Sequence, residues 1–183
     1  MTSNLRLTFM LLVSASAAAG QMSWTLARST LTYHVVHPLH HVEGVSHEAR
    51  GRGLCHGGTC DFLVAVPVQS FRSGDTDRDL HMLQATRGAQ FPMITVRTSV
   101  PEASLHPGDL RADVLISFAG EQKEYAQIAF RINAAGNGDL DLHATIPAKL
   151  SDFKITPPEL LMMPIHNEIP VEVDLNWRRD QQH

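Results

Sequence analysis

Histidines are concentrated in one stretch near the start of the chain. Five lie within fourteen residues: His34, His37, His40, His41 and His47. Imidazole is the commonest ligand for zinc, copper and nickel, so this stretch, together with the later His56, is a candidate metal site. On a strand His34 and His37 point to opposite faces, whereas a turn at the intervening proline could gather His37, His40 and His41. One hypothesis is therefore a metal-binding protein; the alternative is a solvated, histidine-rich loop.

The two cysteines, Cys55 and Cys60, enclose a short segment with a Gly-Gly step. In an oxidising compartment such a pair most often forms a disulfide, and the glycines favour a sharp turn between the two residues. We expect a hairpin with the disulfide near its tip. A metal site formed by Cys55, His56 and Cys60 is the alternative. Haem attachment requires a histidine directly after the second cysteine, where this chain has Asp61.

Signatures of common enzyme classes are missing from the sequence. It contains no G-x-S-x-G, H-E-x-x-H, P-loop or G-x-G-x-x-G motif. Ser151 and Lys154 have the S-x-x-K spacing, but the partner motifs of the serine acyltransferases are absent. We predict that the protein is not an enzyme and requires no cofactor.

Residues 1–19 have the order of parts of a secretory signal peptide: Arg6, an apolar run, and a small-residue exit at Ala17-Ala18-Ala19. The apolar run is about ten residues long, whereas a bilayer-spanning helix needs about twenty. We expect cleavage near Ala19, an exported protein with a single domain over residues 20–183, and no stable membrane insertion after processing. The alternative is a retained N-terminal anchor.

The charge of the chain restricts its partners. The net charge is −4 and no basic cluster is present, which argues against nucleic acid and anionic membrane surfaces as partners. The length suits one domain with a sizeable core. Whether that domain forms a homodimer is left open by the sequence.

Most of the chain has the pattern of short strands, because apolar and polar residues alternate. The expected strands cover residues 30–35, 42–52, 60–68, 94–98, 110–118, 123–132, 139–146 and 169–178. The polar, glycine-containing segment 42–52 is typical of an edge or bent strand. Segment 76–84 predicts a short helix that Asp75 or Thr76 caps. An open sheet of this size has two exposed edges that closure into a barrel removes, although the alternation also fits a sandwich.

Five segments, in the same order, resemble the motifs of YceI-like proteins. They are residues 33–37, 70–82, 91–96, 116–124 and 151–155. The resemblance implies an all-β fold: an antiparallel, eight-stranded, lipocalin-like β-barrel with one short helix. It also implies a periplasmic protein that binds a polyisoprenoid or an isoprenoid quinone-like lipid in the barrel lumen, for carriage, storage or sequestration.

The chain departs from the family pattern at several positions. Ala119 replaces a usual histidine, Leu150 a usual arginine and Lys154 a usual glycine, and residues 85–89 replace a usual F-F-D. We therefore expect the lumen and its mouth to differ from those of typical members.

The inward faces of the strands supply the candidate wall of a lumen, with an ordinary packed core as the alternative. Burying a long apolar chain there would contribute about 0.8 kcal/mol per methylene. Ala112, Ala126 and Ala144 are small residues expected to leave room. His37 and His81 match recurring positions of the family motifs and are candidates for the mouth. The candidate ligand-binding residues are Tyr33, Val35, His37, Phe62, Val64, His81, Ile94, Val96, Ile116, Phe118, Ile128, Phe130, Leu142, Ile146, Val171 and Val173.

Overall fold

Antiparallel strands account for most of residues 22–37, 40–160 and 163–181, the parts of the chain that the computed structural model describes. The predicted signal peptide lies outside them. The first strands are β1 (Ser23–His37), β2 (His40–Ser46), β3 (Arg50–His56), β4 (Thr59–Pro67) and β5 (Met93–Pro101). The later strands are β6 (Gly108–Phe118), β7 (Glu121–Ala134), β8 (Leu140–Lys149), β9 (Glu159–Leu160), β10 (Met163–Pro164) and β11 (Glu168–Arg179).

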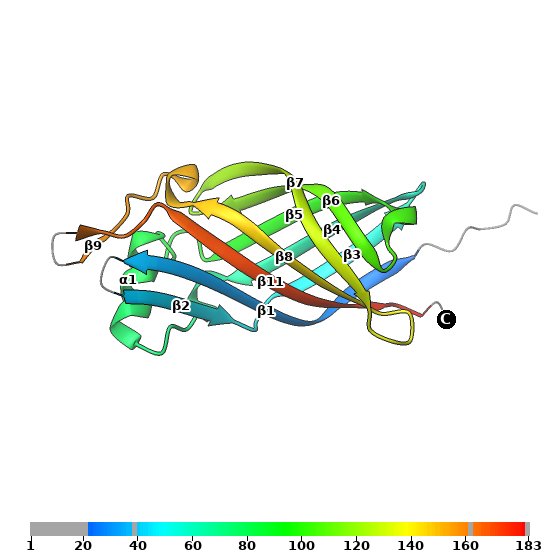
Figure 1. Ribbon diagram of the computed structural model, residues 1–183, viewed down its shortest axis with the longest axis horizontal. Helices are drawn as coiled ribbons and strands as arrows, with labels where there is room; N and C mark the ends of the chain where they lie inside the picture. The colour runs from blue at the N-terminus through cyan, green and yellow to red at the C-terminus, as the bar shows by residue number, and fades with distance from the viewer. Residues whose placement is uncertain (1–21, 38–39, 161–162, 182–183) are drawn as a thin grey trace, which may run out of the picture.

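The main sheet closes on itself. Its order is β11-β8-β7-β6-β5-β4-β3-β1-β2, and β11 also pairs with β1, from Trp24 opposite Arg179 to Tyr33 opposite Val171. Eight strands therefore form a closed antiparallel barrel, and β2 extends from β1 outside the ring (Figure 1). The predicted barrel is confirmed, and the sandwich alternative is excluded.

The single strand predicted over residues 42–52 is wrong, because β2 and β3 are separate strands. Strand β1 is long enough to pair with both, β3 near its start and β2 near its end. The break follows from two contacts that divert β2. The buried Ser46 hydroxyl bonds to the Ser70 hydroxyl at 2.6 Å, and Val45 exchanges backbone hydrogen bonds with Arg72 at 2.9 Å.

Glycines in β2 and β3 make room for aromatic rings. A Cβ at Gly44 would lie 2.3 Å from the ring of Tyr33, its partner across the strands, and a Cβ at Gly53 would lie 2.4 Å from the ring of Phe62. Such distances are far below van der Waals contact, so these positions admit no side chain while the rings stay in place. The glycines that made the segment look like a weak strand therefore serve the packing of the barrel.

Strand β7 contains a bulge that the sequence pattern does not predict. Gln127 has a φ of +55°, and the pairing with β6 shifts register between Ala112 and Val114. As a result Tyr125 is buried and Ala126 is exposed, so the prediction that Ala126 faces the interior is wrong. A bulge adds one residue to a strand and reverses the alternation on one side of it.

The predicted helix is confirmed as α1 (Thr76–Ala85), with Asp75 as its N-cap. The Asp75 carboxylate accepts a hydrogen bond from the backbone N–H of Arg78 at 2.9 Å, and this bond holds the pKa of Asp75 below its usual value. Figure 1 shows α1 at one end of the barrel and the end of β11 at the other. Short 3-10 helices follow β4 (η1, Val68–Ser70), β5 (η2, Glu102–Ser104) and β8 (η3, Leu150–Phe153). No helix of the described residues is long and apolar enough to cross a bilayer.

Candidate ligand-binding cavity

An apolar cavity of about 100 Å³ lies inside the barrel. Its walls come from β1, β4, β5, β6, β7, β8 and β11, with Leu105 added from the loop between β5 and β6. Thr98 is the one non-apolar residue among them, and none of them is ionisable. The cavity is therefore suited to an uncharged, apolar molecule, because burying a charge without a partner is costly.

The predicted lumen residues divide into two groups. The inward alternation of β4, β5, β7, β8 and β11 brings the first group to the cavity wall. These residues are Phe62, Val64, Val96, Phe130, Leu142, Ile146 and Val173. The second group lies outside the cavity wall.

Sequence reasoning missed several lining residues. Most lie on the same inward faces as the predicted residues, so the alternation could have identified them as lining residues. They are Leu31, Val100, Leu110, Val114, Ile132, Leu140, Leu175 and Trp177. Trp24 lies in the first part of β1, which was not predicted as strand, and Leu105 lies in a loop. The alternation of apolar and polar residues therefore could not identify Trp24 or Leu105 as lining residues.

A second cluster of apolar side chains occupies the interior of the barrel near η3. Ile116 and Ile128 are buried in this cluster with Phe153, and Ile94, Phe118 and Val171 pack against it. The rings of Phe118 and Phe153 meet edge to face, with centroids 5.3 Å apart. These predicted lumen residues act as core in this structure rather than as cavity wall.

Two contacts fasten this packed end. The buried Tyr125 hydroxyl donates to an Asp152 carboxylate oxygen at 2.8 Å, which links β7 to η3. Burial raises the pKa of Tyr125, and the Asp152 carboxylate raises it further. The Arg87 guanidinium donates to the backbone carbonyls of Ala119 and Phe153.

The remaining predicted ligand-binding residues lie away from the cavity. Tyr33 is partly buried, with its ring centroid 5.6 Å from that of Phe71, and its pKa is raised by burial and by the Asp79 carboxylate. Val35 is half-buried on β1, and His81 is exposed on α1. The side chain of His37 lies outside the described part of the structure.

The proposed histidine metal site is only partly described. His41 is exposed, while the side chains of His37 and His40 lie outside the described part. His34 instead lies between two carboxylates, 3.2 Å from Glu43 and 3.5 Å from Glu172.

The alternative metal site at the two cysteines does not fit the structure. Among the described residues, the group of potential ligands close enough to hold one ion is Cys55, Cys60 and Glu102. Cys55 and Cys60 are joined in a disulfide, so they offer no thiolate.

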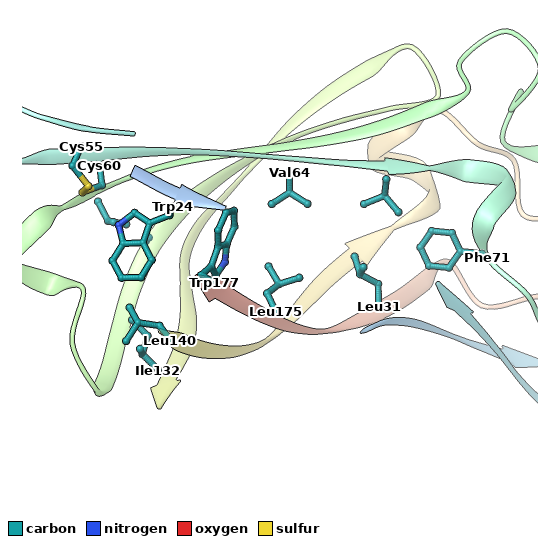
Figure 2. Close-up of a cluster of buried hydrophobic side chains, with 13 residues drawn as sticks. Trp24, Leu31, Cys55, Cys60, Val64, Phe71, Ile132, Leu140, Leu175 and Trp177 are labelled. Carbon is teal, nitrogen blue, oxygen red and sulfur yellow. A yellow bond between two sulfur atoms is a disulfide. The ribbon is translucent and has the colours of Figure 1, made fainter. Parts of the chain in front are cut away.

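At the other end of the barrel, the disulfide is buried in one cluster with both tryptophans of the chain, which line the cavity. Cys55 and Cys60 are directly opposed on β3 and β4, and both are buried. Figure 2 shows a row of buried side chains that runs from the disulfide, past Trp24 and Trp177, to Leu31 and Phe71. The rings of Phe62 and Trp177 meet edge to face at 4.9 Å. The two indoles therefore make up much of this wall.

The sequence matches a known protein family over most of its length. The YceI-like domain matches residues 24–177. This protein belongs to the YceI-like family. No match was found among curated proteins.

Solved structures share this YceI-like fold. A polyisoprenoid binding domain from Saccharophagus degradans, described as implicated in plant cell wall breakdown, is 16% identical with a TM-score of 0.65 over 87% of this chain and 99% of that one. Burkholderia cenocepacia BcnA is 13% identical with a TM-score of 0.67 over 81% and 95%. The Campylobacter jejuni YCEI protein is 12% identical with a TM-score of 0.52 over 100% and 94%. At such identities the likeness concerns the fold.

The departures from the YceI-like pattern gather at the packed end of the barrel. Ala119 is fully buried, and it and Lys154 both have a φ of +51°. Lys154 forms an ion pair with Glu121 at 3.1 Å. Arg87, in the replaced segment, stacks over Phe91 at 5.4 Å in addition to its two carbonyl contacts. Residues that differ from the family pattern therefore form noncovalent contacts that hold this end of the barrel together.

Proposed function

We propose that this protein binds a long, uncharged apolar molecule in the barrel, a polyisoprenoid or an isoprenoid quinone-like lipid, for carriage, storage or sequestration. The observation that carries the proposal is the cavity wall, which is apolar apart from Thr98 and contains no ionisable side chain. Each methylene buried there contributes about 0.8 kcal/mol, so a chain of several isoprene units would bind without any charged contact. The structural similarity to a polyisoprenoid binding domain supports the same class of ligand.

The size of the cavity adds a condition. Its volume of about 100 Å³ is well below the roughly 300–1,000 Å³ of pockets that enclose drug-sized ligands. A long chain therefore has to widen the barrel as it binds. Binding is coupled to movement of strands or side chains, and the free energy of that movement lowers the affinity.

Binding rather than catalysis, with no cofactor, is part of the proposal. It is supported by the lack of ionisable groups in the described cavity wall. Location in the periplasm is likewise proposed, on the strength of the signal-peptide pattern of residues 1–19 and of the disulfide, which persists in oxidising compartments.

The test uses the two tryptophans, which are the only ones in the chain and both line the cavity. A long-chain alcohol brominated along its chain should quench their fluorescence on binding. Val173→Phe, which fills the cavity, should weaken quenching, whereas Val171→Phe is the matched control on the same face of β11 but outside the cavity. An organic extract of the protein purified without detergent should also contain the native lipid. No quenching, or equal loss in both variants, contradicts the proposal.

A further inference from the structure

The wall of the barrel splits between β5 and β6. The two strands pair only from Thr95 opposite Ser117 to Arg97 opposite Leu115. Each continues beyond this pairing, β5 to Pro101 and β6 from Gly108, and each stays paired with its other neighbour over that length. Figure 1 shows the two strands diverging toward the loop that joins them. We call the space between residues 98–101 and 108–114 the β5–β6 gap.

Among the described residues, a single side-chain hydrogen bond spans this gap. The Thr98 hydroxyl donates a hydrogen bond to the backbone carbonyl of Asp113 at 2.8 Å. Among the described residues no backbone hydrogen bond joins the two edges beyond Arg97 and Leu115. The Asp113 carboxylate does not cross the gap, because it accepts a hydrogen bond from the backbone N–H of Gln127 on β7.

Both edges of the gap contribute residues to the cavity wall. Thr98 and Val100 on one edge and Leu110 and Val114 on the other all line the cavity. Leu105, in the loop above the gap, is the one cavity-lining residue that belongs to no strand, and it is only half-buried. Val100 and Val114 are buried, so side chains rather than paired backbone close the wall at this place.

A second split in the wall is filled. Strands β7 and β8 pair only from Phe130 opposite Ala144 to Ala134 opposite Leu140. Where they separate, η3 covers the opening with the buried Phe153, and the Tyr125–Asp152 hydrogen bond holds it there. The seam between β1 and β3 also pairs over only three residues, from Ser23 opposite Leu54 to Thr25 opposite Arg52, but beyond it Val45 and Arg72 exchange backbone hydrogen bonds and the buried Phe71 packs against Tyr33. Among the described residues, the one hydrogen bond across the β5–β6 gap is that from Thr98 to Asp113, so the barrel can widen there with few bonds broken.

We propose that the ligand enters and leaves through the β5–β6 gap, and that its polar end is bound there while its apolar chain lies in the cavity. This proposal rests on the proposed function. The polar end is a hydroxyl or carbonyl group, because the hydroxyl of Thr98, on the edge of the gap, and the unpaired strand edges offer only neutral hydrogen-bonding groups. Outside the gap, Asp109 is already paired with Arg131 at 2.6 Å.

An engineered disulfide across the gap, which we call the gap staple, can be opened by reduction and tests the route. Extending the register places Ser99 opposite Asp113, and both are exposed, so Ser99→Cys with Asp113→Cys should form a disulfide there. The matched control is Arg111→Cys with Ala129→Cys, which joins a directly opposed pair of β6 and β7 that is already hydrogen-bonded into the sheet. Stopped-flow quenching by the brominated alcohol gives the rates of uptake and release.

Closing the gap staple should slow both rates by roughly tenfold, as blocking a gate does, and mild reduction should restore them. The control staple should leave them unchanged. Equal rates with the gap staple closed and open overturn the route, whereas absence of quenching in the unaltered protein overturns the proposed function instead. Should the stapled protein fail to fold, Leu105→Ala serves: faster uptake supports the gap, and unchanged uptake contradicts it.

Thr98→Val tests the polar end. It should weaken binding of the brominated alcohol by about fivefold to tenfold, the effect of one hydrogen bond, and leave binding of the matching bromoalkane unchanged. Equal effects on the two probes overturn the assignment of the polar end to the gap.

Discussion

Ser23, the first residue of β1, donates a 2.8 Å hydrogen bond to Asp180, which directly follows the last residue of β11. The other carboxylate oxygen accepts from the Thr25 hydroxyl at 2.8 Å, and Arg52 on β3 lies 3.2 Å from the carboxylate. One side chain thus fastens three neighbouring strands at the point where the barrel closes.

The hydrogen bonds from Ser23 and Thr25 hold the pKa of Asp180 below its ordinary value. A lowered folded-state pKa stabilises the fold above the unfolded value of about 3.9, and this contribution is lost as the pH falls through the folded pKa. Asp180→Asn should therefore lower stability by about 1 kcal/mol at pH 7 and make less difference at pH 3. Urea unfolding at both pH values measures this. An equal loss at both would show that ionisation of Asp180 does not matter.

Removing the disulfide should destabilise the end of the barrel that holds the tryptophans. The loop that it closes is short, with a sequence separation of 5, and chain entropy predicts a loss of about 2 kcal/mol for Cys55→Ala with Cys60→Ala. Because Trp24 lies beside the disulfide in Figure 2, its fluorescence should also shift in the folded state. Urea unfolding monitored by tryptophan fluorescence reports both effects. A stability loss without a spectral shift would mean that the disulfide acts on the unfolded chain alone.

Gly44→Ala should cost about 1–3 kcal/mol, the usual effect of overpacking, because the new methyl would clash with the ring of Tyr33. Tyr33→Leu removes the ring and should recover part of that loss in the double variant. A double-mutant cycle from thermal unfolding measures the coupling. Additive effects would place the cause of the Gly44→Ala loss elsewhere.

The two tyrosines of the chain, Tyr33 and Tyr125, both have raised pKa values in the fold. An absorbance titration of the native protein should therefore show no phenol that ionises near the ordinary pKa of about 10. Since the raised pKa favours the neutral form, the stabilisation is present below pH 10 and is lost as the pH rises through the folded value. Tyr125→Phe should leave one late-ionising phenol. A native tyrosine that ionises near 10 would contradict the burial described above.

Alternation was a sound guide where a strand is regular. It predicted the inward faces of β4, β8 and β11, because a period of two residues fixes which side chains share a face. It failed at Tyr125 and Ala126, where the bulge at Gln127 adds a residue, and at the start of β1, where polar residues surround Trp24. Bulges depend on contacts between strands, which no local pattern records.

The division between cavity and core was beyond the sequence for a different reason. Val171 and Val173 have the same residue type and lie on the same face of β11, yet only Val173 lines the cavity. The difference arises from what fills the space opposite, since Phe153 and its neighbours pack the end of the barrel at Val171, whereas Val173 borders the cavity. An apolar side chain looks the same in sequence whether it faces another side chain or an empty space.

The pairing of β1 with β11 has a consequence for how the chain folds. The ring is complete only when the strand made first meets a strand made well over a hundred residues later. Topologies dominated by such distant contacts fold slowly. Until β11 docks, both β1 and β8 present an open edge to any other extended chain, so the unclosed barrel is the form most exposed to aggregation.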